Sequence, residues 1–417
     1  MSYAEPQGRQ PTPDSVIIVG AGIVGATTAL FLTQAGVNVT LVERQRPGWG
    51  ASGRNAGYIS MITRSAGAQL ELANLSRSLY VELADEIDNF DFRAAGALVF
   101  YHEEHEALVE AFVAQRAGDG LPIGTVDAAT AHEMCPLLAE DVVGGIHSQA
   151  DAYIHPQKFV EAVTAAAVAQ GARLVVGDVT GLEVRAGRCT GVRTSEGRLD
   201  ADAVALTTGS WTAKLLAEVG MPLHLFHIRL QAAETSPIEE HFNVQLYGPG
   251  IFHEYAFIRN VPAYDDDLVL HPLQRIMPHV GLLPTLVQRA DGRLLLGCPI
   301  EFVEEPDSAA TPTVAGLAQM FGILGDHVPA IQNATVERIW AGVAPQTGDG
   351  VPVMDAVGDI EGLFLGAGHA YGATVGPGSG RVLADRILGL PGRIDLTPYR
   401  YDRPGVVERI SRAVMYS

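Results

Sequence analysis

The clearest hydrophobic pattern in the chain is an apolar strand followed at once by an apolar helix, near the N-terminus. Residues 16–19 are four consecutive β-branched residues, which predict a buried strand. A small, apolar segment then continues to Leu32 and has the composition of a packed helix. A second apolar run over 37–42 is followed by Glu43. This alternation predicts a strand–helix–strand unit and hence an α/β protein.

Helical and strand-like patterns alternate through the rest of the chain. Apolar residues recur at helical spacing over 71–87, and a second amphipathic helix ends at Gly118. Pro156 begins another helix, and short strands broken by turns follow it. Residues 221–304 change to longer mixed strands with many aromatic side chains, which indicates a candidate substrate domain. Near the end, a glycine-rich strand-to-helix junction spans 366–380, and a helix follows.

Three glycines lie between the first strand and its helix. Gly20, Gly22 and Gly25 form the pattern G-x-G-x-x-G, and Glu43 lies 23 residues after Gly20. Such glycines allow a tight turn, close approach of a pyrophosphate and tight helix packing, while an acid at this distance accepts ribose hydroxyls. The helix N-terminus favours phosphate. The pattern predicts a dinucleotide site, and an ordinary strand–turn–helix is the alternative.

The overall charge restricts the partners of this chain. Its 417 residues carry a formal net charge of −20 without a basic block, which argues against nucleic acid or an anionic membrane surface. Apolar residues make up 47% of the chain and charged residues 18%, as in globular proteins. Only Lys158 and Lys214 are lysines, so most positive charge belongs to arginine.

Cysteine usage and the first residues bear on the compartment. Cys135, Cys189 and Cys298 are isolated, so the sequence predicts neither a C-x-x-C pair nor a zinc site. Residues 1–14 lack an apolar segment and are expected to form a loose tail rather than a signal peptide. No run of about 18 apolar residues occurs. We therefore expect a cytoplasmic protein without a transmembrane segment.

Several segments together resemble the D-amino acid oxidase-like (DAO) flavoproteins. This family includes glycine oxidase, sarcosine oxidase, D-amino acid dehydrogenase and the catalytic subunits of opine and proline dehydrogenases. The resemblance covers the chain from Val16 to about Gly389, and its segments occur in the family's order. They are VGAGIVG with Glu43-Arg44, then ASGRNAG, DAYIHP, TTGSW, ADGRLLLG, TGDGVPVMD and GHAYGATVGPGSG. Each segment is modest alone, but the ordered set is specific.

The resemblance implies a fold and a reaction. We expect a mixed α/β (α+β) chain with a Rossmann-type FAD-binding domain, formed by 15–90, 145–220 and 335–417. An interleaved β-sheet substrate-binding domain would be formed by 91–144 and 221–334. The reaction implied is oxidation of a C–N bond of an amine or amino acid by hydride transfer to flavin N5, giving an imine that hydrolyses. No metal is required, because the flavin carries the difficult step.

The resemblance also implies cofactor contacts. The first glycine turn would hold the pyrophosphate, and Glu43 and Arg44 the adenosine part. The loop 51–57 would line the isoalloxazine and phosphates, and the last glycine-rich junction would border the pyrimidine end of the flavin. The expected FAD contacts are Gly20, Gly22, Ile23, Val24, Gly25, Glu43, Arg44, Ala51, Ser52, Arg54, Asn55, Ala56, Gly57, Val179, Gly209, Trp211, Gly368, His369, Gly372, Ala373, Thr374 and Val375.

Three departures from the family concern the substrate, the flavin bond and oxygen. Ala344 stands where relatives often carry an arginine that clamps the substrate carboxylate. Either the substrate has no α-carboxylate, or another side chain holds it, such as Arg54, Tyr255 or Arg259. No cysteine stands where sarcosine oxidases bond their flavin, so non-covalent FAD is expected. Leu295 stands about where those enzymes keep an oxygen-activating lysine.

The candidate catalytic residues are His369 and Tyr371 at the predicted flavin edge, and Tyr255 and Arg259 in the variable domain. A packing role is the alternative for each. Two other functions keep the fold: oxidation of a hydroxy acid, and a flavin-bearing subunit of a hetero-oligomeric dehydrogenase. The acceptor would be O2, a dye-like acceptor or a partner protein, and Leu295 favours the latter two. A homo- or hetero-oligomer is compatible with the sequence.

Overall fold

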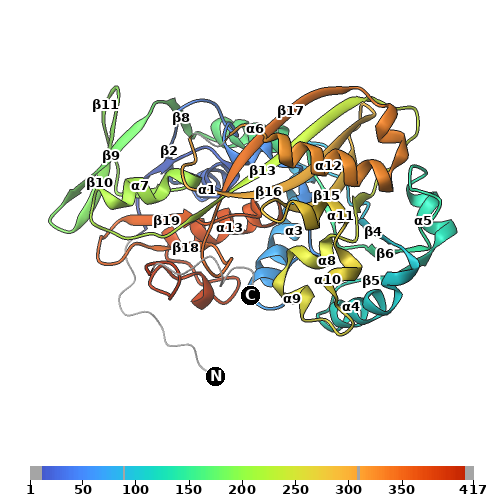
Figure 1. Cartoon of the computed structure of the whole chain (residues 1–417). Helices are drawn as coiled ribbons and strands as arrows, with labels where there is room; N and C mark the ends of the chain where they lie inside the picture. The colour runs from blue at the N-terminus through green and yellow to red at the C-terminus, as the bar shows by residue number, and fades with distance from the viewer. Residues whose placement is uncertain (1–11, 88–89, 308–309, 409–417) are drawn as a thin grey trace.

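A computed structural model of the chain describes residues 12–87, 90–307 and 310–408. A mostly parallel sheet lies beside a larger mixed sheet (Figure 1). The smaller sheet has the order β18-β19-β12-β1-β2-β8, in which β18 runs antiparallel to β19 and the other pairs are parallel. Its strands are β1 (Ser15–Val19), β2 (Asn38–Glu43), β8 (Arg173–Val176), β12 (Ala203–Leu206), β18 (Val353–Ala356) and β19 (Leu363–Ala367).

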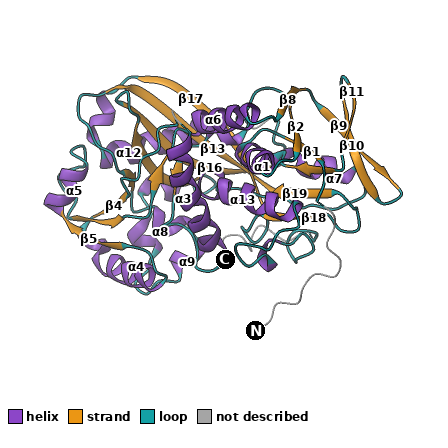
Figure 2. Cartoon of the chain, turned by 180° about the vertical axis from the view of Figure 1, so that it is seen from behind, coloured by secondary structure: helices purple, strands orange, loops and turns teal. Residues whose placement is uncertain are grey.

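Strand β1 is buried on both faces, as its run of β-branched residues predicts. Val16 and Ile18 pack in a core with helices that Figure 2 shows grouped beside the sheet. Ile17 and Val19 pack in a second core with α7 (Thr212–Ala217) and a three-stranded antiparallel sheet. The strands of this sheet are β9 (Val179–Arg185), β10 (Arg188–Thr194) and β11 (Gly197–Asp200). The helices of the first core are α1 (Ile23–Gln34), α3 (Ala68–Glu86), α6 (Pro156–Ala169) and α13 (Gly372–Ile387). The predicted strand–helix–strand start is confirmed.

Helix α13 begins earlier than the sequence pattern predicts. Its first residue is Gly372, so Gly376 and Gly380 are helical and the expected junction over 366–380 is too long. These glycines let α13 lie close to α1: a Cβ on Gly376 would come within 2.7 Å of the Ile23 side chain. Pro377 has no N–H for the fourth carbonyl before it, which belongs to Ala373.

The larger sheet has the order β17-β13-β16-β15-β14-β4-β6-β5. Helices α5 (Ala128–Met134) and α12 (Val314–His327) pack against it in one core, and α4 (Glu106–Gly118) contributes to another. Its strands are β4 (Ala97–Tyr101), β5 (Ile123–Asp127), β6 (Gly144–Ser148), β13 (Phe226–Pro237), β14 (Gln245–Tyr247), β15 (Gly281–Gln288), β16 (Arg293–Val303) and β17 (Val336–Gln346).

The segment between β14 and β15 is not the run of strands that the sequence pattern predicts. It forms short helices, and Pro249, Pro262 and Pro272 lack the N–H that a strand ladder would need. They are α8 (Ile251–Glu254), α9 (Ala256–Arg259), α10 (Asp266–Val269) and α11 (Pro272–Ile276).

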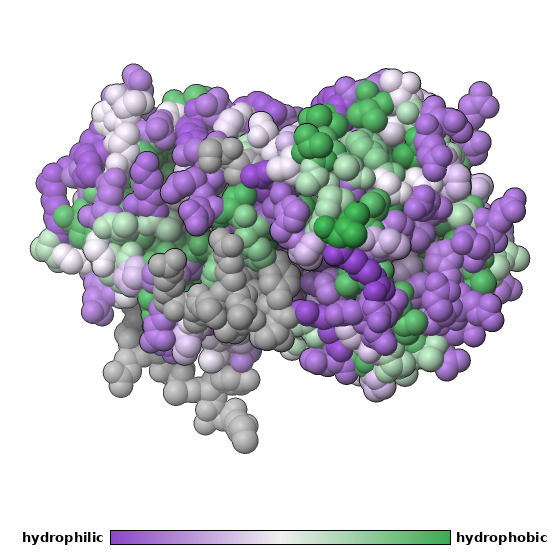
Figure 3. Space-filling view, viewed as in Figure 1, coloured by the Kyte–Doolittle hydropathy of each residue, from purple (hydrophilic) through white to green (hydrophobic). Residues whose placement is uncertain are grey.

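The division into two domains stays a prediction, but strand pairing departs from its proposed boundaries. Both β6 and β17 belong to the larger sheet, although 145–220 and 335–417 are assigned to FAD binding by sequence. Figure 3 shows a largely hydrophilic face with a group of hydrophobic residues in its right half. Within 12–87, 90–307 and 310–408, no helix is long and apolar enough to cross a membrane. The predicted tail over 1–14 lies mostly outside the described residues.

Candidate functional site

The turn between β1 and α1 forms the base of a cavity. Gly20 has φ +100°, and a Cβ there would lie 2.7 Å from the Thr207 carbonyl oxygen, so this position requires glycine. The Ile23 N–H donates to Ser52 Oγ at 3.0 Å, and a Cβ on Gly22 would lie 3.0 Å from that same oxygen. The two glycines therefore place no side chain over the start of α1, where a phosphate could approach the backbone and the Ser52 hydroxyl.

Glu43 and Gly25 both contact this turn, but they have different roles. The Glu43 carboxylate accepts the Ala21 N–H at 2.9 Å, which holds it at the cavity wall with lone pairs left for a ribose. A Cβ on Gly25 would lie 2.5 Å from Thr207 Oγ1 and would also collide with the Gly20 carbonyl oxygen. Glu43 thus lines the cavity, whereas Gly25 allows α1 to pack tightly against the strand.

The cavity has a volume of about 450 Å³ and reaches from this turn to Gly342 and Ala344 on β17. It brings together residues from both sheets and from the loop around α2 (Ala51–Arg54). The residues expected from sequence that line it are Gly20, Gly22, Ile23, Val24, Glu43, Arg44, Ala51, Ser52, Arg54, Asn55, Val179, Gly209, Trp211, His369 and Gly372.

The remaining expected residues lie behind the cavity wall or beside it. The Ala373 carbonyl accepts the Tyr80 hydroxyl at 2.6 Å, which satisfies the oxygen that Pro377 leaves free. Thr374 Oγ1 accepts the Ser60 N–H at 3.0 Å. Direct contact with FAD stays a prediction for the residues outside the lining, which are Gly25, Ala56, Gly57, Gly368, Ala373, Thr374 and Val375.

The cavity wall also includes residues that were not expected from the sequence, among them Trp49, Lys214 and Asp307. The guanidinium of the expected residue Arg44 lies 4.2 Å from the centre of the Trp211 ring and 5.3 Å from that of Trp49. Trp211 Nε1 donates to Asp307 at 2.8 Å, and Lys214 also lines the cavity. Trp49 could have been noticed as an aromatic residue in a glycine-rich loop. Asp307 carries no local signal, because it reaches the wall from the link after β16.

His369 lines the cavity close to the start of α13. Burial lowers the pKa of its imidazole to about 3, so the ring is neutral at physiological pH. Its Nε2 is buried and has no hydrogen-bond partner among the described residues. A neutral imidazole offers a ligand a single hydrogen bond through this nitrogen and supplies no positive charge.

Arg64 is the most important residue that sequence reasoning missed. It is 1% exposed, and its guanidinium lies 3.3 Å from the centre of the Tyr371 ring and 5.6 Å from that of Tyr255. Nη2 donates to Thr63 Oγ1 at 2.9 Å, whereas Nε and Nη1 have no hydrogen-bond partner in the described part of the chain. Arg64 lines a narrow second cavity together with His369, which also borders the main one.

Of the expected catalytic residues, Tyr255 and Tyr371 lie beside Arg64, whereas Arg259 lies outside both cavities. The rings of Tyr255 and Tyr371 lie 6.3 Å apart between centroids, beside the guanidinium. Arg259 ends α9, and its charge opposes part of the rise in the Glu254 pKa that burial causes. The role of each residue in catalysis stays a prediction.

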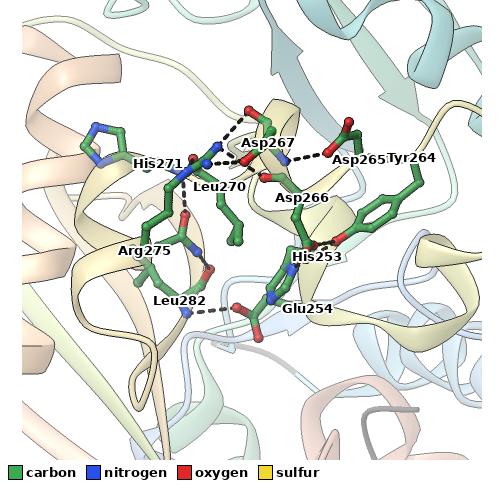
Figure 4. Close-up of polar contacts among 11 residues, drawn as sticks. His253, Glu254, Tyr264, Asp265, Asp266, Asp267, Leu270, His271, Arg275 and Leu282 are labelled. Carbon is green, nitrogen blue, oxygen red and sulfur yellow. Dashed lines mark hydrogen bonds and ion pairs between the residues drawn. The ribbon is translucent and has the colours of Figure 1, made fainter.

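Polar contacts hold His253 and Glu254, which directly precede Tyr255 in the chain; Figure 4 shows the contacts of these two residues. The buried carboxylate of Glu254 accepts the Leu282 N–H at 2.9 Å, and burial raises its pKa to about 7. His253 Nδ1 lies 2.8 Å from the Tyr264 hydroxyl and 3.1 Å from Asp266. These contacts tie α8 to β15 and α10, which limits the movement of Tyr255.

The three departures from the family have clear places in the structure. Ala344 lines the main cavity and offers no side-chain donor. Leu295 is fully buried in an apolar cluster, so no charge stands there. Cys298 does not line the cavity. Among the described residues, no group of histidine, cysteine and acidic side chains could hold a metal ion.

The donors and acceptors of the main cavity fit FAD. The open backbone at the start of α1 suits a pyrophosphate, and Glu43 suits a ribose. The far end holds the unpartnered Nε2 of His369 and the first turn of α13, where N–H groups favour negative charge on a flavin ring. A dinucleotide with one ring system at each end matches this arrangement.

Comparisons with known proteins agree with this assignment. The DAO family model, described as FAD dependent oxidoreductase, matches residues 15–386. A glycine oxidase of Pseudomonas putida is 26% identical over 399 residues, covering 92% of this chain and 97% of that protein. A D-amino acid dehydrogenase of Rhizobium rhizogenes is 26% identical over 451 residues, covering 94% of this chain and 100% of that protein.

A solved structure supports the fold. The crystal structure of glycine oxidase from Geobacillus kaustophilus has a TM-score of 0.79 at 24% identity, covering 94% of this chain and 98% of that chain. The resemblance inferred from the ordered sequence segments is therefore confirmed. Because the family model spans both sheets and the whole cavity, this chain belongs to the DAO family of FAD-dependent oxidoreductases.

Proposed function

We propose that this enzyme oxidises the C–N bond of an amino acid whose carboxylate is held by Arg64, with FAD bound non-covalently in the main cavity. The observation that carries the proposal is the buried guanidinium of Arg64, two of whose nitrogens have no hydrogen-bond partner among the described residues. The names of the relatives glycine oxidase and D-amino acid dehydrogenase also refer to amino acids.

Electrostatics favour an anionic ligand at Arg64. Burying a cation costs several kcal/mol unless an anion or hydrogen bonds compensate. Stacking on Tyr371 offsets about 2 kcal/mol of this, and the single bond to Thr63 leaves the charge undercompensated. A substrate carboxylate would provide charge-assisted hydrogen bonds of about 1.5–3 kcal/mol each. The undercompensated charge therefore favours a carboxylate ligand, and in this proposal Arg64 takes over the anchoring role that Ala344 cannot fill.

The other residues of the site have supporting roles in this proposal. FAD, when bound, accepts the two electrons that the oxidation releases. Tyr255 and Tyr371 shield the guanidinium of Arg64 from water, which strengthens its attraction for a carboxylate. Neutral His369 offers Nε2 to the ligand and leaves the substrate amine free of a competing positive charge. Such positioning of the reacting bond is the main contribution that the protein makes.

Non-covalent binding of FAD is supported by the positions of the cysteines. Cys135 and Cys189 are buried in apolar clusters, and Cys298 does not line the main cavity. Acid precipitation of the purified yellow protein should therefore leave the colour in the supernatant. Colour that stays in the denatured pellet, with a matching mass increase on one peptide, would show a covalent bond instead.

The function is tested with Arg64→Met and Arg64→Lys. We expect anaerobic addition of the right amino acid to bleach the flavin of the wild-type enzyme. Arg64→Met should raise KM about tenfold to a hundredfold, because a charge-assisted bond is lost, and Arg64→Lys should recover part of the lost affinity.

The same variant also tests the buried charge without substrate. The free energy of unfolding of Arg64→Met should be about 1–4 kcal/mol higher than that of wild type, because an uncompensated buried charge is gone.

Arg46→Met is the matched control, since Arg46 is exposed and paired with Glu161. It should change neither KM nor the binding of small carboxylate inhibitors. Equal inhibitor binding by wild type and Arg64→Met would refute the role of Arg64. Bleaching by hydroxy acids in place of amino acids would keep that role and refute C–N oxidation.

A further inference from the structure

A residue from the link that follows strand β16 lies at the rim of the main cavity. Asp307 lies in the link between β16 and α12, and its carboxylate accepts the Trp211 Nε1–H at 2.8 Å. The same carboxylate lies 3.9 Å from the guanidinium of Arg44. Trp211 follows β12 and Arg44 follows β2, so both partners belong to turns of the smaller sheet. All three residues line the cavity.

Arg44 joins these contacts into a stack. Its guanidinium lies over the Trp211 ring at 4.2 Å and near the Trp49 ring at 5.3 Å, which are cation–π distances. The side chains of Arg44 and Asp307 are 32% and 69% exposed, so the stack stands at the surface end of the cavity. Asp307 therefore connects the link after β16 to the two turns that carry Arg44 and Trp211.

We infer that Asp307 is a positioning residue that slows the release of FAD by fixing the Arg44–Trp211 stack over the cavity rim. The inference rests on the proposed non-covalent binding of FAD in this cavity. Arg44 is expected to contact the adenosine part, so a stack held in place keeps that contact formed. The effect belongs to the dissociation rate, because the contacts must open before the cofactor leaves.

Two substitutions separate the contacts that Asp307 makes. Asp307→Asn keeps an oxygen for the indole N–H and removes the charge that attracts Arg44. Asp307→Ala removes both contacts. Glu304→Gln is the matched control, because Glu304 is an exposed acid in the same link and does not line the cavity.

The experiment measures the release of FAD from the holoenzyme. Each variant is loaded with FAD, desalted and diluted, and the rise of free FAD fluorescence gives the dissociation rate constant at low and high salt. We expect Asp307→Ala to release FAD about three- to tenfold faster than wild type, and Asp307→Asn to be intermediate. Salt should accelerate release from wild type more than release from Asp307→Asn, since screening weakens the ion pair that only wild type has.

Further readouts separate this role from general destabilisation. The thermal midpoints of the apo-variants should equal that of the wild-type apoprotein, and Glu304→Gln should release FAD at the wild-type rate. Release from Asp307→Ala at or below the wild-type rate would overturn the inference and leave the proposed function intact. A wild-type protein that binds no FAD would overturn both.

Discussion

At the scale of single residues, the arginine that could anchor a substrate is not the one expected from the sequence. Arg54 was a candidate anchor, but its Nε donates to the Trp49 carbonyl at 3.1 Å and Nη1 to the Ala341 carbonyl at 3.2 Å. Its charge therefore braces the loop around α2 against β17. Arg64 is the buried arginine with unpartnered nitrogens beside His369, so the anchoring role passes to it.

Asp151 fixes the segment that leads to Arg64. Its carboxylate accepts the Met61 and Ile62 N–H groups at 3.2 Å each and the Ser148 hydroxyl at 2.6 Å. Burial nevertheless raises the pKa of Asp151 to about 7, well above its ordinary value. A raised folded-state pKa means that its contribution to stability is complete at low pH and falls as the pH rises from about 4 to 7.

We therefore predict a pH-dependent difference between wild type and Asp151→Asn. The free energy of unfolding of wild type, relative to the variant, should fall by up to about 1.4 kcal/mol per pH unit between pH 5 and 7 and then level off. Urea unfolding at several pH values measures it. Asp85→Asn, a change at an exposed acid of α3, is the matched control. A pH-independent difference for Asp151→Asn would contradict the account.

At the scale of elements, the cavity depends on how closely α13 approaches α1. The N-termini of both helices border the cavity, at Ile23 and Gly372. A Cβ on Gly380 would lie 2.9 Å from the Thr28 backbone nitrogen and 2.8 Å from Thr27 Cβ. Small residues at this crossing therefore set the distance between the two helix starts and hence the width of the cofactor site.

Gly380→Ala should push the two helices apart. We predict a loss of about 1–3 kcal/mol in stability, because the added methyl group overpacks a buried contact, together with weaker FAD binding. Thermal unfolding and FAD titration measure the two effects. Gly118→Ala in α4 is the control: its Cβ meets open space, so the substitution should be neutral or slightly stabilising. A Gly380→Ala variant with wild-type stability and affinity would show that the crossing tolerates more volume.

At the scale of the whole molecule, the distribution of positive charge bears on the electron acceptor. Reduced flavin reacts with oxygen through a step that develops negative charge, which a nearby cation stabilises. His369 is neutral, Leu295 is apolar and buried, and the charge of Arg64 would be paired with the substrate. Lys214 lies on α7, beside residues expected to hold adenosine, and Lys158 lies in α6.

We predict that oxygen is a poor acceptor and that a dye or partner protein is a better one. Loss of about 1.4 kcal/mol of transition-state stabilisation slows a reaction tenfold, so reoxidation in air-saturated buffer should be at least about tenfold slower than turnover with a dye. Stopped-flow mixing of the substrate-reduced enzyme with each acceptor measures both rates. Faster reoxidation by oxygen than by the dye would make the enzyme an oxidase.

Sequence alone determined the parts of this protein that depend on neighbours within a few residues. The β-branched run at 16–19, the glycine pattern that begins at Gly20, and Glu43 at the end of β2 predict a dinucleotide cradle from the local sequence. The ordered family segments then supplied the fold and the cofactor class, which the family match confirmed.

Only the tertiary structure decided which residues meet across the site. Arg64, Tyr255 and Tyr371 are far apart in sequence, and Asp307 reaches the cavity from the opposite sheet. The helical state of Gly376 and Gly380 likewise follows from packing on α1, since glycine has low intrinsic helix propensity. Local patterns carry no signal for such contacts, because the energy of a buried charge or a close helix crossing depends on groups brought together by folding.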